Sequence, residues 1–486
     1  MNSIMLQTIE RQPLKKHIGF LRFTGHKKGY LLTNDTGGYC ILSVHEFSDF
    51  IEGRLDTLKK PRLARLRELG FLADTLNLEK LIGEYASRRA FLSAGTNLHI
   101  VVITLRCDHG CIYCQTSSGR PADKGLDMDI TTARQTVDRI FESQSKLITI
   151  EFQGGEPTLN FDTLRFIVDY ASEKNRSAGK DLLFSLVTNL VSLNQKQFDY
   201  LVKNKVSICT SLDGPEILQN KQRIFFEGRG SYRKTLHWLK KFKKSFGSRE
   251  FPHKINALAT ITRHSFPHYK KIVDEYTGLG LNIIHLRPAN PFGLASHNWG
   301  KIGFSADEFL SFYRKTFDYI LKKNLAGEFI AERTAAIFLK KIFSDIDPNY
   351  LDLRSPCGAG IGQLAYNFDG DVFSCDEGRM LAKTGDDAFK IGNVRSNDYH
   401  DFMASPVLKA VCLASCLDNL AGCQDCAYMP YCGVCPAYNY SLTGNIYGKE
   451  PHNDRCRINK GILDHIFDKI EDTDCAEIFK TWINHT

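Results

Sequence analysis

The sequence has no long apolar stretch and no recognisable export signal. No run approaches the roughly 18 consecutive apolar residues of a membrane span, and the opening MNSIMLQTIERQPLKK has no apolar core followed by a cleavage site. We therefore expect a cytoplasmic protein that does not cross a membrane. Lysine and arginine are dispersed, and the net charge of +8 is small for 486 residues. No nucleic acid partner is therefore expected.

Cysteine is nearly absent from the first part of the chain and abundant later. Of the fifteen cysteines, only Cys40 precedes residue 107, whereas nine lie between Cys357 and Cys456. In a reducing cytosol, clustered cysteines are more often metal ligands or catalysts than disulfides. This uneven placement indicates chemistry at defined sites.

Apolar, β-branched runs alternate with amphipathic stretches between residues 97 and 290. The expected strands are 98–106, 147–154, 182–189, 206–214, 255–262 and 282–290, and the expected helices are 131–144, 161–174, 194–204, 232–246 and 268–280. Strands that are apolar at nearly every position favour a parallel sheet covered by helices. We therefore expect an α/β fold with a partial (β/α)6 barrel of the TIM type. Its functional residues should gather at the carboxyl ends of the strands.

The flanks differ from this core. Residues 29–43 read as two strands around a glycine-containing turn, followed by helical segments. This small α+β module is either a packing appendage or a docking module whose exposed strand pairs with a peptide. After about residue 355 the chain is short of long periodic segments, as expected where metal clusters replace part of a core. The expected parts are the module at 1–92, the core at 93–300, a helical linker at 301–350 and a cysteine-rich iron–sulfur domain at 351–486.

Three cysteines directly follow the first expected strand. Cys107, Cys111 and Cys114 form a CxxxCxxC array. Three thiolates in one loop can bind three irons of a [4Fe-4S] cubane and leave the fourth iron open for a cofactor or substrate. A structural zinc site, the alternative, normally needs a fourth protein ligand and CxxC spacing. Tyr113, just before the last cysteine, is expected to pack beside the cofactor rather than to react.

Glycine or polar residues end the next three expected strands. In the GGEP segment at 154–157, the glycines let a ligand approach the backbone, and the carboxylate can accept from an ammonium group. A serine and an arginine after the fourth strand can bind a carboxylate. Because these strand ends share one mouth, they suit the methionine half of an amino acid cofactor. The residues of this predicted site are Gly154, Gly155, Glu156, Asn189, Ser211 and Arg223.

These motifs resemble the radical S-adenosylmethionine (SAM) superfamily over roughly residues 97–460. CxxxCxxC with an aromatic residue before its last cysteine, GGEP and SLDG occur in the strand order of that family. The resemblance implies that the open iron chelates the amine and carboxylate of SAM. It also implies that the cluster donates an electron that cleaves SAM to methionine and a 5'-deoxyadenosyl radical, which abstracts a substrate hydrogen. Side chains are then expected to position SAM and exclude water.

The C-terminal cysteines read C-x12-G-x4-C, then C-x2-C-x5-C-x2-C, then a final cysteine, and resemble the SPASM auxiliary-cluster domain of peptide-modifying members. The resemblance implies two further [4Fe-4S] clusters; a zinc ribbon is the alternative. The expected ligands are Cys423, Cys426, Cys432 and Cys456 for one cluster and Cys357, Cys375 and Cys435 for the other. The family's last spacing is x3, so Cys435 departs from it by one residue. Cys416 is the candidate for the missing fourth ligand. Cys412, one helical turn earlier, is interpreted equally well as a ligand or as a buried thiol.

Asp376 follows Cys375 directly. This placement resembles the cysteine–aspartate pair of sulfatase-maturating relatives, which implies a general base for a substrate proton. The alternative is a turn aspartate.

Several segments also resemble the radical maturase of the His-Xaa-Ser repeat peptide system. They are LLTNDTGGY at 31–39, the cysteine loop at 97–115, IEFQGGEP at 150–157, residues 358–381 and CQDCAY at 423–428. This resemblance implies a ribosomally made precursor peptide as substrate, with a crosslink as the expected product. The expected partners are an electron donor of the flavodoxin or ferredoxin type and a second radical maturase. The alternatives are a formylglycine-forming sulfatase maturase and a non-catalytic iron–sulfur or zinc scaffold that binds peptides.

Overall fold

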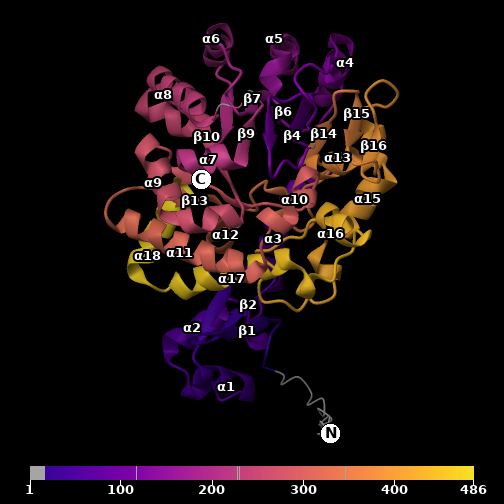
Figure 1. Ribbon diagram of the computed structural model, residues 1–486. Helices are drawn as coiled ribbons and strands as arrows, with labels where there is room; N and C mark the ends of the chain where they lie inside the picture. Colours follow the sequence, from indigo (N-terminus) through magenta and orange to yellow (C-terminus); the bar gives the residue numbers. More distant parts are fainter. Residues whose placement is uncertain (1–16, 117, 227, 229, 345, 486) are drawn as a thin grey trace, which may run out of the picture.

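The computed structural model describes residues 17–116, 118–226, 228, 230–344 and 346–485. A nine-stranded sheet forms its centre (Figure 1). The strands are β4 (Leu98–Thr104), β6 (Leu147–Gly154), β7 (Asp181–Thr188), β8 (Ser207–Ser211), β10 (Ile255–Ile261), β12 (Leu286–Pro288), β14 (Gln363–Tyr366), β15 (Asp371–Phe373) and β16 (Lys390–Asn393). Their spatial order is β12-β10-β8-β7-β6-β4-β14-β15-β16.

The first five strands expected from the sequence lie in the parallel part of this sheet, whereas the sixth, expected at 282–290, is divided and only β12 of it joins the sheet. From β4 to β12 they pair with their neighbours in chain order, and every pair is parallel. Alternate residues of β6, namely Ile148, Ile150 and Phe152, are fully buried. The predicted α/β fold with a partial barrel is therefore confirmed. The structure adds β14, parallel to β4, and the antiparallel strands β15 and β16.

Helices connect the parallel strands. They are α4 (Ile130–Phe141), α5 (Phe161–Ala178), α6 (Gln195–Lys203), α7 (Glu216–Gln222), α8 (Tyr232–Lys254) and α9 (Tyr269–Leu279). Asp129 begins α4 by accepting from the Thr132 amide at 2.7 Å, and Asn194 begins α6 with a capping box. Five of these helices fall on the expected segments, and α7 is additional. Because all connections pass through helices, the carboxyl ends of the strands lie together at one mouth.

A second group of helices packs beyond the barrel. It comprises α10 (Leu294–Ile302), α11 (Ala306–Leu325), α12 (Arg333–Phe343), α17 (Asp454–Lys469) and α18 (Thr473–His485), with the short parallel pair β11 (Ile283–Ile284) and β13 (Ala331–Glu332). Helices α17 and α18 contact α11 and α12. The expectation that the C-terminal region lacks long regular segments is therefore wrong for its end, because buried Phe479 and Trp482 join the aromatic core of α11. Among the described helices, none is long and apolar enough to cross a membrane.

The cysteine-rich region before α17 holds only short helices. They are α13 (Asp376–Ala382), α14 (Tyr399–Ala404), α15 (Pro406–Leu413) and α16 (Pro436–Thr443). Cys375 caps α13 and Cys435 caps α16, since each thiol accepts from a backbone amide of the first turn. Thiols thus stand at helix starts, where backbone N–H groups favour negative charge.

The N-terminal module is a three-stranded antiparallel sheet with three helices. Its elements are β1 (Arg22–His26), β2 (Gly29–Thr33), β3 (Tyr39–Leu42), α1 (Val44–Glu52), α2 (Lys60–Glu68) and α3 (Leu78–Arg88). The two expected strands are β2 and β3, and β1 is additional. Leu32, Phe50 and Phe71 are buried in a core of the module's own. The Thr33 hydroxyl donates to the Ala427 carbonyl at 2.7 Å, so the module contacts the cysteine-rich region.

Candidate active site

The cysteine loop follows β4 directly. Arg106 holds its base, because the guanidinium donates to the Asp127 carboxylate at 2.7 and 2.8 Å. Two short strands, β5 (His109–Cys111) and β9 (Arg223–Phe225), hold its middle by antiparallel pairing. A loop fixed at two points presents its thiols in one arrangement.

A cavity of about 180 Å³ opens between this loop and the carboxyl ends of β6, β7, β8 and β10. It brings together all the residues predicted for this mouth except Glu156. The predicted residues that line it are Cys107, Cys111, Cys114, Tyr113, Gly154, Gly155, Asn189, Ser211 and Arg223. Arg287, from β12, lines it as well and was not predicted.

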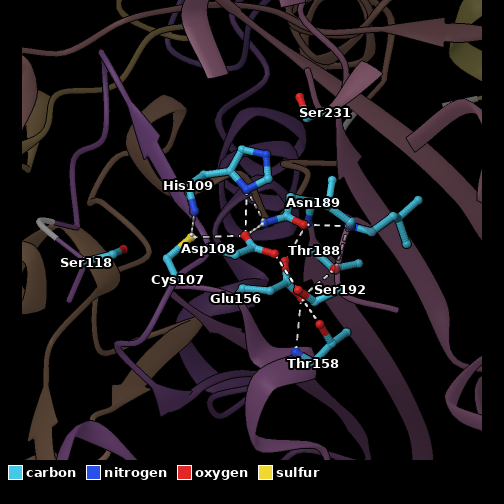
Figure 2. A network of polar contacts seen from close by, with 12 residues as sticks. Cys107, Asp108, His109, Ser118, Glu156, Thr158, Thr188, Asn189, Ser192 and Ser231 are labelled. Carbon is cyan, nitrogen blue, oxygen red and sulfur yellow. Dashed lines mark hydrogen bonds and ion pairs between the residues drawn. The ribbon is translucent and has the colours of Figure 1, made fainter. Parts of the chain in front are cut away.

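Glu156 lies behind the cavity wall. Its carboxylate is fully buried and accepts from the Thr158 amide and hydroxyl, the Thr188 hydroxyl and the Asn189 amide at 2.7–3.0 Å (Figure 2). Burial, reinforced by the charge of Asp108, raises the pKa of Glu156 to about 7. The expectation that this carboxylate itself accepts from an ammonium group is therefore not supported. It ties the ends of β6 and β7 together instead.

The two glycines pack against backbone carbonyls at the end of β4 and just after it. Gly154 has φ +147°, and a Cβ there would lie 1.9 Å from the Thr104 carbonyl oxygen. A Cβ on Gly155 would lie 2.1 Å from the Arg106 carbonyl oxygen. Glycine is thus required by close packing of the strand ends.

Asp108 is a site residue that sequence reasoning missed. Figure 2 shows its carboxylate among the side chains of His109, Asn189 and Ser192. The side-chain amide of Asn189 and the Ser192 hydroxyl donate to it at 2.7 and 2.5 Å, and His109 Nδ1 lies 2.5 Å away. Although burial opposes ionisation, these hydrogen bonds hold the pKa of Asp108 below its usual value. The sequence feature that could have pointed to Asp108 is an acidic residue between the first two cysteines of the loop. Asp108 fixes Asn189 at the cavity.

Arg223 stands opposite Cys111 in the β5–β9 pair. Its Nη1 donates to the Tyr113 hydroxyl at 2.8 Å, and that hydroxyl donates to Asp213 at 2.8 Å. Arg223 Nε is buried without a hydrogen-bond acceptor among the described residues. An unpaired buried donor at the cavity suits an anionic ligand group.

The thiols also suit a cationic occupant. Burial raises the pKa of Cys107, with the charges of Cys111 and Asp108 adding to the rise, and it brings the pKa of Cys111 to about 12 although the Arg223 charge opposes it. Thiolates in such a place need a compensating positive charge. The residues present therefore fit an iron–sulfur cluster beside an amino acid ligand.

The C-terminal cysteines gather in two places. Cys423, Cys426, Cys432 and Cys456 line one cavity of about 50 Å³. Cys357, Cys375 and Cys435 share a second buried cluster of side chains. Cys416, expected to complete the second set, directs its thiol to the Asp418 carboxylate at 3.5 Å instead. Its placement at the start of a turn after α15 does not support the expected role.

Asp376 begins α13 and is nearly buried. Its Oδ1 accepts from Arg379 Nε at 2.7 Å. The carboxylate is therefore ion-paired within its own helix. The next residue, Glu377, lies 3.6 Å from Arg287 of the cavity.

Residues 101–282 match the Radical SAM superfamily. This span holds the three cysteines of the loop and Arg223, which meet at the cavity. The protein is a radical SAM enzyme. In sequence it is similar to the cysteine-type anaerobic sulfatase-maturating enzyme of Clostridium novyi (strain NT), with 23% identity over 68% of this chain and 83% of that protein. It is also similar to the radical SAM cyclopropyl synthase TigE of Paramaledivibacter caminithermalis, with 24% identity over 57% of this chain and 56% of that protein.

The fold of this radical SAM enzyme is shared with solved structures. The AdoMet-bound structure of anSMEcpe covers 80% of this chain and 98% of its own, with TM-score 0.66 and 17% identity. Streptococcus suis SuiB bound to precursor peptide SuiA covers 89% of this chain and 98% of its own, with TM-score 0.51 and 15% identity.

Proposed function

We propose that this radical SAM enzyme is a peptide maturase that modifies a ribosomally made precursor of the His-Xaa-Ser type. The observation that carries the proposal is the cavity where three thiols, two glycines and Arg223 meet at the strand ends. When bound there together, a [4Fe-4S] cluster and SAM supply the one-electron chemistry that removes a hydrogen atom from a substrate carbon.

The side chains of the chain hold and orient these groups. The three loop thiolates are the proposed iron ligands, and Arg223, with its free Nε donor, is the proposed partner of the SAM carboxylate together with Ser211. Asp108 and Glu156 are positioning residues, because both hold Asn189 at the cavity wall. Tyr113 connects the cysteine loop to Asp213, because its hydroxyl donates to that carboxylate.

A peptide substrate is supported by the relatives. One relative is named for sulfatase maturation, another is named a cyclopropyl synthase, and SuiB was solved with a precursor peptide. The proposed product is an intramolecular crosslink, with a flavodoxin- or ferredoxin-type electron donor and a second radical maturase as further partners. Formylglycine formation is the second candidate, since the sulfatase-maturating relative aligns over 68% of the chain.

The test is an anaerobic reaction of the reconstituted enzyme with dithionite, SAM and a synthetic peptide bearing His-Xaa-Ser repeats. We expect 5'-deoxyadenosine and a peptide that is lighter by two hydrogen atoms, located by tandem mass spectrometry. An unchanged repeat peptide beside a converted sulfatase-motif peptide would favour formylglycine formation. If no 5'-deoxyadenosine forms, both enzymatic functions are ruled out, and the non-catalytic peptide-binding scaffold is the hypothesis that remains.

The cysteine inventory predicts the iron content. Three [4Fe-4S] clusters require about twelve irons per chain, and Cys426→Ala is expected to remove about four of them by disrupting the cavity that Cys426 lines. Colorimetric iron assays on reconstituted protein measure both values. Cys475→Ala is the matched control, since Cys475 is a buried residue of α18 outside both cysteine groups. This variant should keep the wild-type iron content. A wild-type content near four irons would contradict the auxiliary clusters.

We also propose that the N-terminal module docks the peptide. A groove of about 540 Å³ runs between its sheet and α3, lined by Phe20, Leu69, Leu76, Leu81, Ile82 and Tyr85. Ile82 is 67% exposed although it is apolar, as expected for a surface that binds a partner.

Ile82→Asp is expected to weaken peptide binding about tenfold, because it places a charge among the apolar side chains that line one part of the groove. Fluorescence anisotropy with a labelled repeat peptide measures this change. Leu325→Asp, at the similarly exposed end of α11, is the control and should bind normally. Cleavage of SAM without peptide should match wild type in both variants. Equal affinity of Ile82→Asp and wild type would refute docking in this groove.

A further inference from the structure

The β5–β9 ribbon, which contains the middle of the cysteine loop, has two unlike faces. Successive side chains of a strand point to opposite faces. Arg223 and Phe225 are buried, and Arg223 stands opposite Cys111. Ile224, between them, is 49% exposed and stands opposite Gly110. The inner face of the ribbon therefore carries residues of the site, and its outer face is open to solvent.

The outer face of the ribbon is apolar. Phe226 directly follows β9 and is 53% exposed. Its ring lies against Gly110, since a Cβ on that glycine would lie 3.0 Å from Phe226 Cε1. Ile224 and Phe226 thus adjoin the same glycine and form one exposed apolar patch. Apolar side chains that are exposed together mark a candidate interaction surface.

This patch lies close to two thiols of the loop. Gly110, which the patch covers, is the chain neighbour of Cys111. On its other side, the His109 amide donates to Cys107 Sγ at 3.4 Å (Figure 2). The rings of His109 and Phe225 lie 5.4 Å apart between their centroids. Because electron transfer slows steeply with distance, a surface this close to the thiols is a place where an electron can enter.

Basic side chains border the patch. Lys234, at the start of α8, places its ammonium group 4.8 Å from the centroid of the Phe225 ring. Helix α8 holds eight lysine and arginine residues but only one glutamate. Arg233, Lys240 and Lys244 are exposed and recur on one face of this helix. A surface with this charge attracts an acidic partner and speeds its approach.

We propose that the patch of Ile224 and Phe226, bordered by Lys234 and α8, is the docking surface for an acidic one-electron donor protein of the flavodoxin or ferredoxin type. This inference rests on the proposed function, which includes such a donor and places a cluster at the loop. One electron leaves the reduced donor, which is thereby oxidised, and enters the cluster of the loop, which is thereby reduced. No bond forms or breaks in this step. A small apolar centre with a charged rim suits the brief encounters of electron-transfer proteins.

The experiment compares donor binding and two electron sources in the reconstituted full-length enzyme. The double variant Ile224→Glu/Lys234→Glu replaces an apolar contact and reverses a charge at the patch. Its affinity for purified flavodoxin or ferredoxin, measured anaerobically by surface plasmon resonance, is expected to fall at least about tenfold. Formation of 5'-deoxyadenosine with a subsaturating amount of the reduced donor should fall by a similar factor. Formation with dithionite should stay at the wild-type rate, because this small reductant needs no docking surface.

The matched control is the double variant Leu183→Glu/Lys315→Glu. Leu183, near the start of β7, is 50% exposed, and Lys315 is exposed on α11. The same chemical changes are thus made away from the patch, and this variant should match wild type in donor binding and with both electron sources.

Equal donor affinity in the patch variant and wild type would overturn the proposal, as would the failure of both donors to bind wild type. An equal loss with dithionite and with the donor would also overturn it, because the substitutions would then act on the loop itself. Weaker binding of the repeat peptide, with donor binding unchanged, would assign the surface to the substrate. Donor binding that the patch variant weakens, in an enzyme that forms no 5'-deoxyadenosine with either reductant, would support the docking surface. The error would then lie in the proposed function.

Discussion

Cys114→Ala is expected to abolish SAM cleavage. Cys114 lines the cavity beside Cys107 and Cys111, and a cluster held by only three protein ligands cannot lose one of them without losing iron. Because the reaction depends wholly on that cluster, the rate of 5'-deoxyadenosine formation should fall by at least about a thousandfold. Chromatography of anaerobic reactions with dithionite and SAM measures it.

Cys40→Ala is the control for this experiment. Cys40 is buried in the core of the N-terminal module, away from the loop. Its variant should cleave SAM at the wild-type rate, and iron content should fall by about four only in Cys114→Ala. An unchanged 5'-deoxyadenosine yield in Cys114→Ala would refute the assignment of the loop as the cluster site.

Gly154→Ala is expected to destabilise the protein by about 3–5 kcal/mol. The added Cβ would lie 1.9 Å from the Thr104 carbonyl oxygen, and the backbone stands at φ +147°, where residues with a side chain are strained. Neither β4 nor β6 can move easily, because the two strands are paired along their length. Urea unfolding followed by circular dichroism measures the shift in midpoint.

The matched control is Gly278→Ala. Gly278 lies in α9, and a Cβ there would meet nothing within 4 Å. This variant should be as stable as wild type or slightly more stable, because alanine favours a helix by roughly 0.5–1 kcal/mol. Equal unfolding midpoints for Gly154→Ala and wild type would show that the strand ends are free to separate.

The parallel barrel was predictable because its signal is local and repeated. Each of the six strands is a short apolar run followed by an amphipathic stretch, and parallel connections bring their carboxyl ends to one mouth. The three loop cysteines, Asn189 and Ser211 could therefore be placed together from their positions relative to the strands. The end of the chain was less predictable, since α17 and α18 depend on packing against α11 and α12.

Within the site, the direction in which each side chain points could not be predicted from the sequence. Glu156 stands in a strand-end motif, but its carboxylate turns into the wall toward Thr158 and Thr188. Asp108 contacts Asn189, 81 positions later, which no local spacing indicates. For Asp376 the resemblance implied a general base and the alternative was a turn aspartate; its partner Arg379, one helical turn later, is known only from the structure.

The sequence alone determined the radical SAM core, because cysteine spacing and strand order are properties of neighbouring residues. The resemblance to the SPASM domain also grouped Cys423, Cys426, Cys432 and Cys456, and these four cysteines line one cavity. The tertiary structure decided which groups face one another across the chain. It brought Cys357, Cys375 and Cys435 into one buried cluster, because these residues come from three separate segments whose approach is set by packing.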